Sequence, residues 1–271
     1  MIYIKSTDGS KIAVYDPNPK GRDTVVLIHG WPLSHKIFEY QENLLLDLGF
    51  RVVTLDLRGF GNSDTTKCGY DYVQMATDIF VVVKTLKLKN FILGGFSMGG
   101  AIVLRYMRIF NGLGVKKLML FAAAAPIWTK RNDFPYGIEI ETANDLIKQA
   151  CVNRPELACT FSHEMLFATP HPQPVLNWFE DISLSASGYG TIQTAISLRD
   201  EDGREDLCTV HVPTGIFQGC KDEVVPNDLT MLQYESIPGA VLYSLENSGH
   251  GIMYDELEHF NSCMMDFIYN N

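Results

Sequence analysis

Residues 91–100 read Phe91-Ile92-Leu93-Gly94-Gly95-Phe96-Ser97-Met98-Gly99-Gly100. An apolar run typical of a buried strand ends here at a serine, and an apolar run compatible with a helix follows at residues 101–107. The serine stands in a Gly-x-Ser-x-Gly pattern between strand and helix, where a sharp turn is expected. A Cβ atom at Gly95 or Gly99 would collide with the neighbouring strand or helix. We therefore expect a strained turn that lifts the Ser97 hydroxyl clear of a sheet.

Further apolar runs lie before and after this turn, and they alternate with segments of helical periodicity. The expected strands are residues 24–28, 51–55, 91–96, 115–125, 213–217 and 240–245, and the expected helices are residues 37–48, 71–88, 101–107, 227–235 and 256–269. Two shorter strands, 2–4 and 11–15, flank an Asp8-Gly9 hairpin signal. Repeated alternation of strand and helix predicts an α/β fold with a mostly parallel central sheet flanked by helices.

The alternation stops at Pro126, and from there to residue 206 the pattern favours helices alone. These helices are expected at residues 140–151, 155–167, 175–187 and 189–198. We therefore predict a core formed by residues 1–125 and 207–271, with a helical cap inserted at residues 126–206. Such a cap would cover the serine and enclose a pocket. The aromatic residues of this region indicate an apolar pocket, and they are Trp31, Trp128, Phe134, Tyr136, Phe161, Phe167, Trp178 and Phe179. We expect only a few of them to reach the pocket and the others to form the core of the cap.

Composition limits the partners of the chain. With 46% hydrophobic and 20% charged residues among 271, it can bury a sizeable core. A formal net charge of −10 argues against binding to nucleic acid or an acidic membrane surface. No secretory signal and no apolar run long enough to span a membrane is visible. The six cysteines are scattered without a C-x-x-C pair, so we expect reduced thiols and a cytoplasmic location. Oligomeric state stays open.

A serine hydroxyl needs a base within hydrogen-bonding reach and an acid that orients this base. His250 is the best base, because it follows the last expected strand in the glycine-bracketed loop Gly249-His250-Gly251. Asp222 follows the preceding strand and is the best acid, whereas the adjacent Glu223 should point the other way. The chain order Ser97, Asp222, His250 matches a known order of serine triads. Four other histidines are expected to be packed or solvated: His163, His171, His211 and His259.

A developing oxyanion needs two backbone donors. The Met98 amide lies at the start of the helix after Ser97, and the Trp31 amide lies in the loop after the strand at residues 24–28. We expect His29 and the loop segment Asp56-Leu57-Arg58-Gly59 to brace these loops rather than to take part in chemistry. No histidine is evident at metal-ligand spacing from a cysteine or an acid, and no dinucleotide-binding turn is present. The sequence thus predicts no metal site and no cofactor.

Five segments together carry a resemblance to a known family: His29-Gly30-Trp31-Pro32, residues 56–64, residues 95–100, residues 219–226, and Gly249-His250-Gly251. In these segments the chain resembles the α/β-hydrolases, and most closely their cofactor-free haloperoxidase, perhydrolase and arylesterase branch. Residues 134–138 and 199–202 also look like the lid of that branch. The resemblance implies the triad Ser97, Asp222 and His250 and the oxyanion pair Trp31 and Met98. It further implies that haloperoxidase activity would need no metal and would follow from peracid formation.

The reaction expected from these residues is hydrolysis of small aryl or alkyl carboxylic esters through an acyl-serine, with perhydrolysis as a side activity. This makes the chain a carboxylesterase or arylesterase of the serine hydrolase type, with a small-molecule ester as substrate. Two alternatives stay open. One is a carbon–carbon bond hydrolase with the same triad. The other is a ligand-binding receptor that keeps the fold without catalysis. The natural ester is not given by the sequence.

Overall fold

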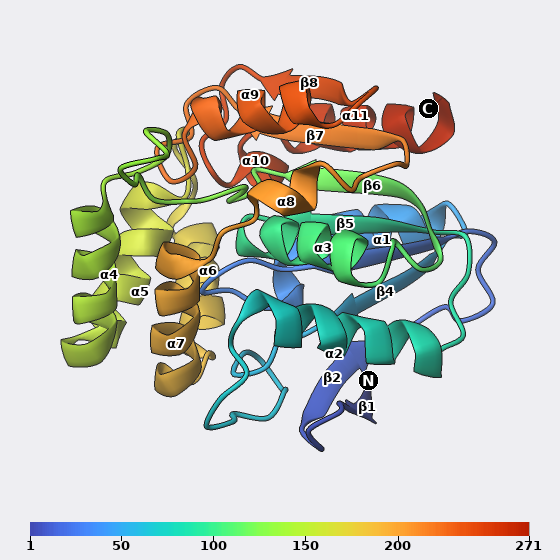
Figure 1. Ribbon diagram of the computed structural model, residues 1–271, viewed down its shortest axis with the longest axis horizontal. Coiled ribbons are helices and arrows are strands. Elements are labelled where there is room, and N and C mark those ends of the chain that lie inside the picture. Colours follow the sequence, from blue (N-terminus) through green and yellow to red (C-terminus); the bar gives the residue numbers. More distant parts are fainter. Residues whose placement is uncertain (271) are drawn as a thin grey trace.

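The computed structural model describes residues 1–270. Its centre is an eight-stranded sheet with the strand order β1-β2-β4-β3-β5-β6-β7-β8 (Figure 1). The strands are β1 (Ile2–Lys5), β2 (Lys11–Tyr15), β3 (Thr24–Ile28), β4 (Arg51–Leu55), β5 (Phe91–Phe96), β6 (Val115–Phe121), β7 (Thr214–Gly219) and β8 (Val241–Leu245). Strand β2 is antiparallel to both of its neighbours, and every pairing from β4 to β8 is parallel. The predicted α/β class with a mostly parallel sheet is confirmed.

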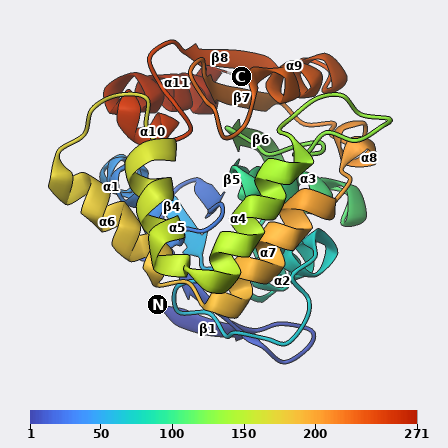
Figure 2. The same cartoon turned by 90° about the vertical axis from the view of Figure 1, so that its left-hand side faces the viewer.

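Helices cover both faces of this sheet. The helices of the chain before β7 are η1 (His35–Phe38), α1 (Glu39–Asp47), α2 (Tyr72–Thr85), α3 (Met98–Ile109), α4 (Ile140–Val152), α5 (Arg154–Thr160), the π-helical turn η2 (Phe161–Met165), α6 (Gln173–Leu184), α7 (Gly188–Asp200) and α8 (Arg204–Leu207). After β7 they are α9 (Asn227–Ser236), α10 (Ile252–Asp255) and α11 (Leu257–Asn270). Helices α2, α3 and α9 lie on one face, and α1 and α11 lie on the other (Figures 1 and 2). The inner strands are buried on both sides, which explains why they read as continuous apolar runs.

Four helices between β6 and β7 stand apart from the two flanking layers. Figure 2 shows α4, α5, α6 and α7 together in front of one edge of the sheet. In the described residues, the segment between β6 and β7 contains no named strand, only isolated bridges such as Thr129 to Ile138. This is the segment in which the cap was predicted. The domain limits themselves stay a prediction.

Several predicted elements differ from the structure. Strand β6 ends at Phe121 rather than at residue 125, because the chain leaves the sheet at Ala122, whose φ is +43°. The helix expected at residues 155–167 is divided into α5 and η2. The last helix is preceded by the separate short helix α10. No helix in residues 1–270 has the length and apolar character needed to cross a membrane.

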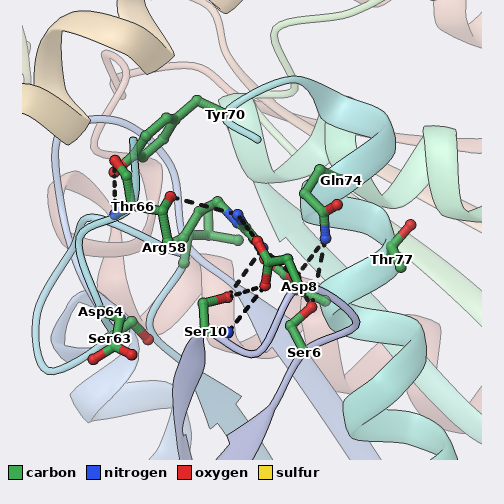
Figure 3. A network of polar contacts seen from close by, with 12 residues as sticks. Ser6, Asp8, Ser10, Arg58, Ser63, Asp64, Thr66, Tyr70, Gln74 and Thr77 are labelled. Atoms are coloured by element: carbon green, nitrogen blue, oxygen red, sulfur yellow. Dashed lines mark hydrogen bonds and ion pairs between the residues drawn. The ribbon is translucent and has the colours of Figure 1, made fainter. Parts of the chain in front are cut away.

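A buried arginine ties the N-terminal hairpin to the loop after β4 (Figure 3). The Arg58 guanidinium donates to Asp78 of α2 at 2.7 Å and to Asp8 in the β1–β2 turn at 2.8 Å. Burial opposes ionisation of Asp8, but hydrogen bonds from Arg58 and Ser10 outweigh it and lower the pKa of Asp8 to about 2. The network fixes the loop that follows β4, and this loop borders the carboxyl edge of the sheet. The predicted role of Arg58 as a brace agrees with these contacts.

Candidate active site

Ser97 lies in the tight turn between β5 and α3. Its backbone has φ +53° and ψ −119°, a region that a residue with a side chain seldom adopts. The turn is held because Ser97 N–H donates to Phe121 O at 2.9 Å and Ser97 O accepts from Ala124 N–H at 3.0 Å. A Cβ at Gly95 would come within 2.5 Å of Gly99 O, as the sequence predicted. The turn leaves Ser97 only 5% exposed, at the floor of a cavity.

His250 and Asp222 are brought together from the loops after β8 and β7. The two residues are hydrogen-bonded between His250 Nδ1 and Asp222 Oδ2, at 2.8 Å, and both side chains are fully buried. The second carboxylate oxygen, Oδ1, accepts from the backbone N–H groups of Val224 at 2.9 Å and Val225 at 2.8 Å. Gln218 adds a longer hydrogen bond to Oδ2, at 3.2 Å. The carboxylate therefore has a fixed orientation and can hold the imidazole with Nδ1 protonated.

The other ring nitrogen of His250 is unpaired. His250 Nε2 is buried and has no hydrogen-bond partner among residues 1–270. No hydrogen bond joins it to Ser97 Oγ in the described chain, although the His250 ring contacts the Phe96 ring at a centroid distance of 4.8 Å. A buried unpaired imidazole nitrogen is costly, so this atom favours a proton donor beside it. Catalytic hydrogen bonds are often loose in the absence of substrate, so the missing bond to the Ser97 hydroxyl does not exclude this serine as the donor.

The two predicted oxyanion donors come from the start of α3 and from the loop after β3. Met98 is the first residue of α3, so its N–H is among those without an acceptor inside the helix. Trp31 follows β3, and its indole N–H donates to Thr191 O of α7 at 2.9 Å. Neither backbone N–H forms a hydrogen bond with another residue in the described part of the chain. Both amides are therefore available to an external acceptor.

The cavity above Ser97 is apolar and is built from both the sheet edge and the inserted helices. The cavity is narrow, with a volume of only about 10 Å³, and is lined by Trp31, Ser97, Trp128, Leu146, Phe161, Met165, Leu198 and Val224. Of the aromatic residues predicted for this pocket, only Trp31, Trp128 and Phe161 line it. Phe167, Trp178 and Phe179 instead pack with Tyr254 in a separate aromatic cluster.

A second, more polar pocket adjoins this cavity. Its volume is about 530 Å³, it is partly open to solvent, and its lining includes Lys221, Asp222, Glu223 and Met165. Both Asp222 and Glu223 line this pocket, and neither lines the cavity above Ser97. Met165 lines both spaces and separates the apolar cavity from the polar pocket. The arrangement suits a molecule with an apolar end near Ser97 and a polar end toward solvent.

Asp255 is absent from the residues predicted for the site, although it holds the His250 loop. Its buried carboxylate accepts from the N–H of Gly249 at 2.7 Å and from the N–H groups of Ala168 and Thr169 at 2.9 and 3.1 Å. His171 Nε2 lies 3.0 Å from Asp255 Oδ1. The only sequence signal is an acid five residues after the histidine, directly before the expected last helix. That signal could not show the contact with the inserted segment.

His29 and Asp56 hold the neighbouring loops. The His29 ring accepts from Leu57 N–H at Nε2, at 2.9 Å, and its Nδ1 lies 2.8 Å from Gly30 O. Burial lowers the pKa of His29 to about 4, so the ring is neutral at pH 7. Asp56 accepts from both the backbone N–H and the ring of His35. Both residues are fully committed to internal hydrogen bonds, which fits the predicted bracing role.

Comparison with known proteins identifies what the chain is similar to. A family model described as alpha/beta hydrolase fold matches residues 23–150. The AB hydrolase superfamily protein YisY of Bacillus subtilis is 43% identical, with 98% of each chain covered. An esterase from Exiguobacterium antarcticum is also 43% identical and has a TM-score of 0.95, with 98% of each chain covered. A bromoperoxidase from Bacillus anthracis is 30% identical, with a TM-score of 0.94 and 99% of each chain covered. The resemblance stated from the sequence is confirmed.

Proposed function

The chain belongs to the α/β-hydrolase superfamily, and from this premise we propose that it is a serine esterase acting on small carboxylic esters with an apolar acyl or aryl group. The observation that carries the proposal is the buried hydrogen-bonded pair of His250 and Asp222, together with Ser97 in a strained turn that lines an apolar cavity. The esterase similar to this chain at 43% identity supports the same reaction class.

The proposed reaction begins when Ser97 Oγ attacks the ester carbonyl carbon and passes its proton to His250 Nε2. Asp222 stabilises the imidazolium through Nδ1. The backbone N–H groups of Trp31 and Met98 donate to the oxyanion. His250 then returns the proton to the departing alcohol, which leaves an acyl-serine. Water, deprotonated by His250, attacks the acyl carbon and releases the carboxylic acid and the free serine.

Burial of the unpaired His250 Nε2 supports this proton path. No hydrogen-bond donor or acceptor of the described chain is paired with this nitrogen, so it is free to accept a proton. Asp222 Oδ1 accepts two backbone hydrogen bonds, and Oδ2 is bonded to His250 Nδ1. The imidazole therefore stays bonded to Oδ2 and keeps one orientation. The pair thus offers one proton acceptor, His250 Nε2, and supports the proposal that this nitrogen receives the proton of Ser97.

A second reaction follows from the same intermediate. If hydrogen peroxide replaces water as the attacking molecule, the acyl-serine yields a peracid and the free serine. The peracid then oxidises a halide in solution. The similarity to a bromoperoxidase favours this side activity, and neither step requires a metal or cofactor from the chain.

The test is hydrolysis of p-nitrophenyl esters of increasing acyl length by the wild type, Ser97→Ala and Asp222→Asn. We expect Ser97→Ala to lose at least a thousandfold in kcat, and Asp222→Asn to lose a comparable factor because the imidazole takes the wrong tautomer. Ser162→Ala is the matched control, because Ser162 is a buried serine that does not line the cavity.

Two outcomes would redirect the proposal. Equal turnover by the wild type and Ser97→Ala would mean that another residue is the nucleophile. If neither protein hydrolyses any ester, a vinylogous diketone should be offered next, since a carbon–carbon bond hydrolase would cleave it with the same triad. Ligand binding that is unchanged by Ser97→Ala, without turnover of either substrate class, would identify a receptor.

A further inference from the structure

Three side chains outside the active site converge between two helices of the inserted segment. They are Cys159 near the end of α5, His163 in the π-helical turn η2, and Glu180 in α6. One potential ligand atom from each lies within 4.8 Å of those of the other two. His163 Nε2 is 2.9 Å from Glu180 Oε2. None of the three takes part in the proposed reaction.

The residue types are those that zinc prefers. A thiolate, an imidazole and a carboxylate are each common zinc ligands, and three protein ligands leave a fourth tetrahedral position for water. Cys159 and His163 are four residues apart, so they project from neighbouring positions on one continuous helical face. Tetrahedral coordination would place the ligand atoms roughly 3.5 Å from one another, so the site closes by a shift of about 1 Å. All three side chains are partly exposed, and small rotations can provide this shift.

The charge around the thiol also favours a cation. The carboxylates of Glu180, Glu156 and Glu164 place negative charge near the Cys159 thiol. The same negative potential attracts a divalent ion. A bound thiolate and the Glu180 carboxylate would balance the two positive charges.

We propose that Cys159, His163 and Glu180 form a binding site for a zinc-class divalent cation that links α5 and η2 to α6. Binding replaces the hydrogen bond between His163 and Glu180 with two metal bonds and converts the Cys159 thiol to a thiolate, which releases one proton to solvent. The imidazole would then carry its proton on Nδ1, where the side-chain amide of Gln173 lies 3.5 Å away. Rotation of that amide offers its oxygen as the acceptor.

This site is distinct from the predicted active site and does not depend on the proposed esterase function. It does, however, border the apolar cavity through the backbone of η2, because Phe161 and Met165 flank His163 and line that cavity. A metal that fixes η2 against α6 would therefore stabilise one wall of the pocket. The sequence predicted no metal site, and Glu180, 17 residues beyond His163, is joined to the pair only by folding.

Cobalt(II) titration of the reduced, chelator-treated full chain tests the site. We expect one equivalent of Co²⁺ to produce thiolate-to-cobalt charge-transfer absorption and the strong d–d bands of a four-coordinate site, and Zn²⁺ to abolish both. Cys159→Ser should lose the charge-transfer band, and His163→Gln and Glu180→Gln should each weaken binding at least tenfold. Cys151→Ser, at an exposed cysteine of α4, is the matched control and should bind as the wild type does.

Thermal unfolding gives a second readout. Zn²⁺ at a hundredfold excess over the wild-type Kd should raise the Tm of the wild type by roughly 5 °C and that of His163→Gln by no more than about half as much. The proposal is overturned if the wild type shows no thiolate–cobalt band, or if Cys159→Ser keeps it. Circular dichroism without metal shows whether each variant is folded. Since neither readout uses an ester, failure here leaves the proposed function untouched, and failure of the esterase assay leaves this site untouched.

Discussion

Asp255 accepts a hydrogen bond from the backbone N–H of Gly249 at 2.7 Å, directly before His250 in the chain. The same carboxylate accepts from Ala168 and Thr169 in the inserted segment. Gly251 N–H also donates to Leu166 O, at 2.6 Å. The loop that carries the proposed base is thus attached to the segment that roofs the cavity, and Asp255 joins the two.

We therefore predict that Asp255→Asn lowers kcat about tenfold while the protein is fully folded. An asparagine presents one oxygen and one NH2 group to a cluster of N–H donors, so at least one of these hydrogen bonds is lost and the His250 loop shifts. The free energy of unfolding should fall by about 2 kcal/mol. Steady-state kinetics at a temperature well below Tm, combined with urea unfolding, measures both.

The exposed acid Glu258 on α11 supplies the control. Glu258→Gln removes one negative charge from the same region without touching the loop, and it should change neither kcat nor stability. If Asp255→Asn loses stability but keeps the kcat of the wild type, Asp255 acts on folding alone and does not position His250.

The shape of the apolar cavity should set acyl-chain preference. Leu198 of α7 lines this cavity, and Leu198→Ala removes three carbon atoms from its wall. Since each buried methylene contributes about 0.8 kcal/mol, the optimal acyl chain should lengthen by about two methylenes, with a gain of roughly fourfold in kcat/KM for each. A series of p-nitrophenyl esters measures this shift.

A buried leucine outside the cavity separates this effect from loss of stability. Leu229 of α9 is fully buried and does not line the cavity. Leu229→Ala and Leu198→Ala should each lower the free energy of unfolding by about 2–5 kcal/mol. Only Leu198→Ala should change the acyl preference. The same shift in both variants would show that the cavity over Ser97 is not the acyl site.

Two glycines illustrate different reasons for lacking a side chain. A Cβ at Gly99 would collide with the backbone oxygens of Ile28 and His29, whereas a Cβ at Gly49 meets nothing within 4 Å but would have to adopt φ +82°. Gly49→Ala should therefore cost about 1 kcal/mol. Gly99→Ala should cost at least 3 kcal/mol, because backbone of β3 and the following loop would have to move. Chemical denaturation of both variants makes the comparison, and equal costs would show that the turn after Ser97 can relax.

Local patterns predicted the parts of the site that depend on neighbouring residues. The turn at Ser97 is determined by Gly95 and Gly99 within one short segment, so its strain and its position between strand and helix could be foreseen. Asp222 and His250 could be foreseen because each follows a strand of a parallel sheet, and the carboxyl ends of such strands meet at one edge.

Features that depend on contacts between distant segments could not be foreseen. Asp255 contacts Ala168 across the junction of core and insertion, and Glu180 meets Cys159 and His163 only because two helices pack side by side. The predicted end of β6 at residue 125 was wrong for a similar reason. The four alanines at residues 122–125 continue the apolar run of the strand. However, Ala124 N–H donates to Ser97 O and not to a strand, and this contact depends on the turn at Ser97.

The buried ring of His29 should make stability depend on pH. Burial lowers its pKa from the ordinary 6.5 to about 4, so between these values the unfolded chain binds a proton that the folded chain does not. This contribution is fully present above pH 6.5 and is lost as the pH falls toward 4. A fall of the pKa from 6.5 to about 4 corresponds to a loss of about 3 kcal/mol.

His29→Gln removes this titration while keeping a hydrogen-bonding side chain at the position. We expect the variant to be less stable than the wild type at pH 7, because the geometry of the hydrogen bond to Leu57 N–H is altered. Between pH 6.5 and 4 its free energy of unfolding should fall by about 3 kcal/mol less than that of the wild type. Urea unfolding at a series of pH values measures the difference. Parallel curves for the two proteins would mean that His29 takes up a proton in the folded state and that another group causes the loss of stability in acid.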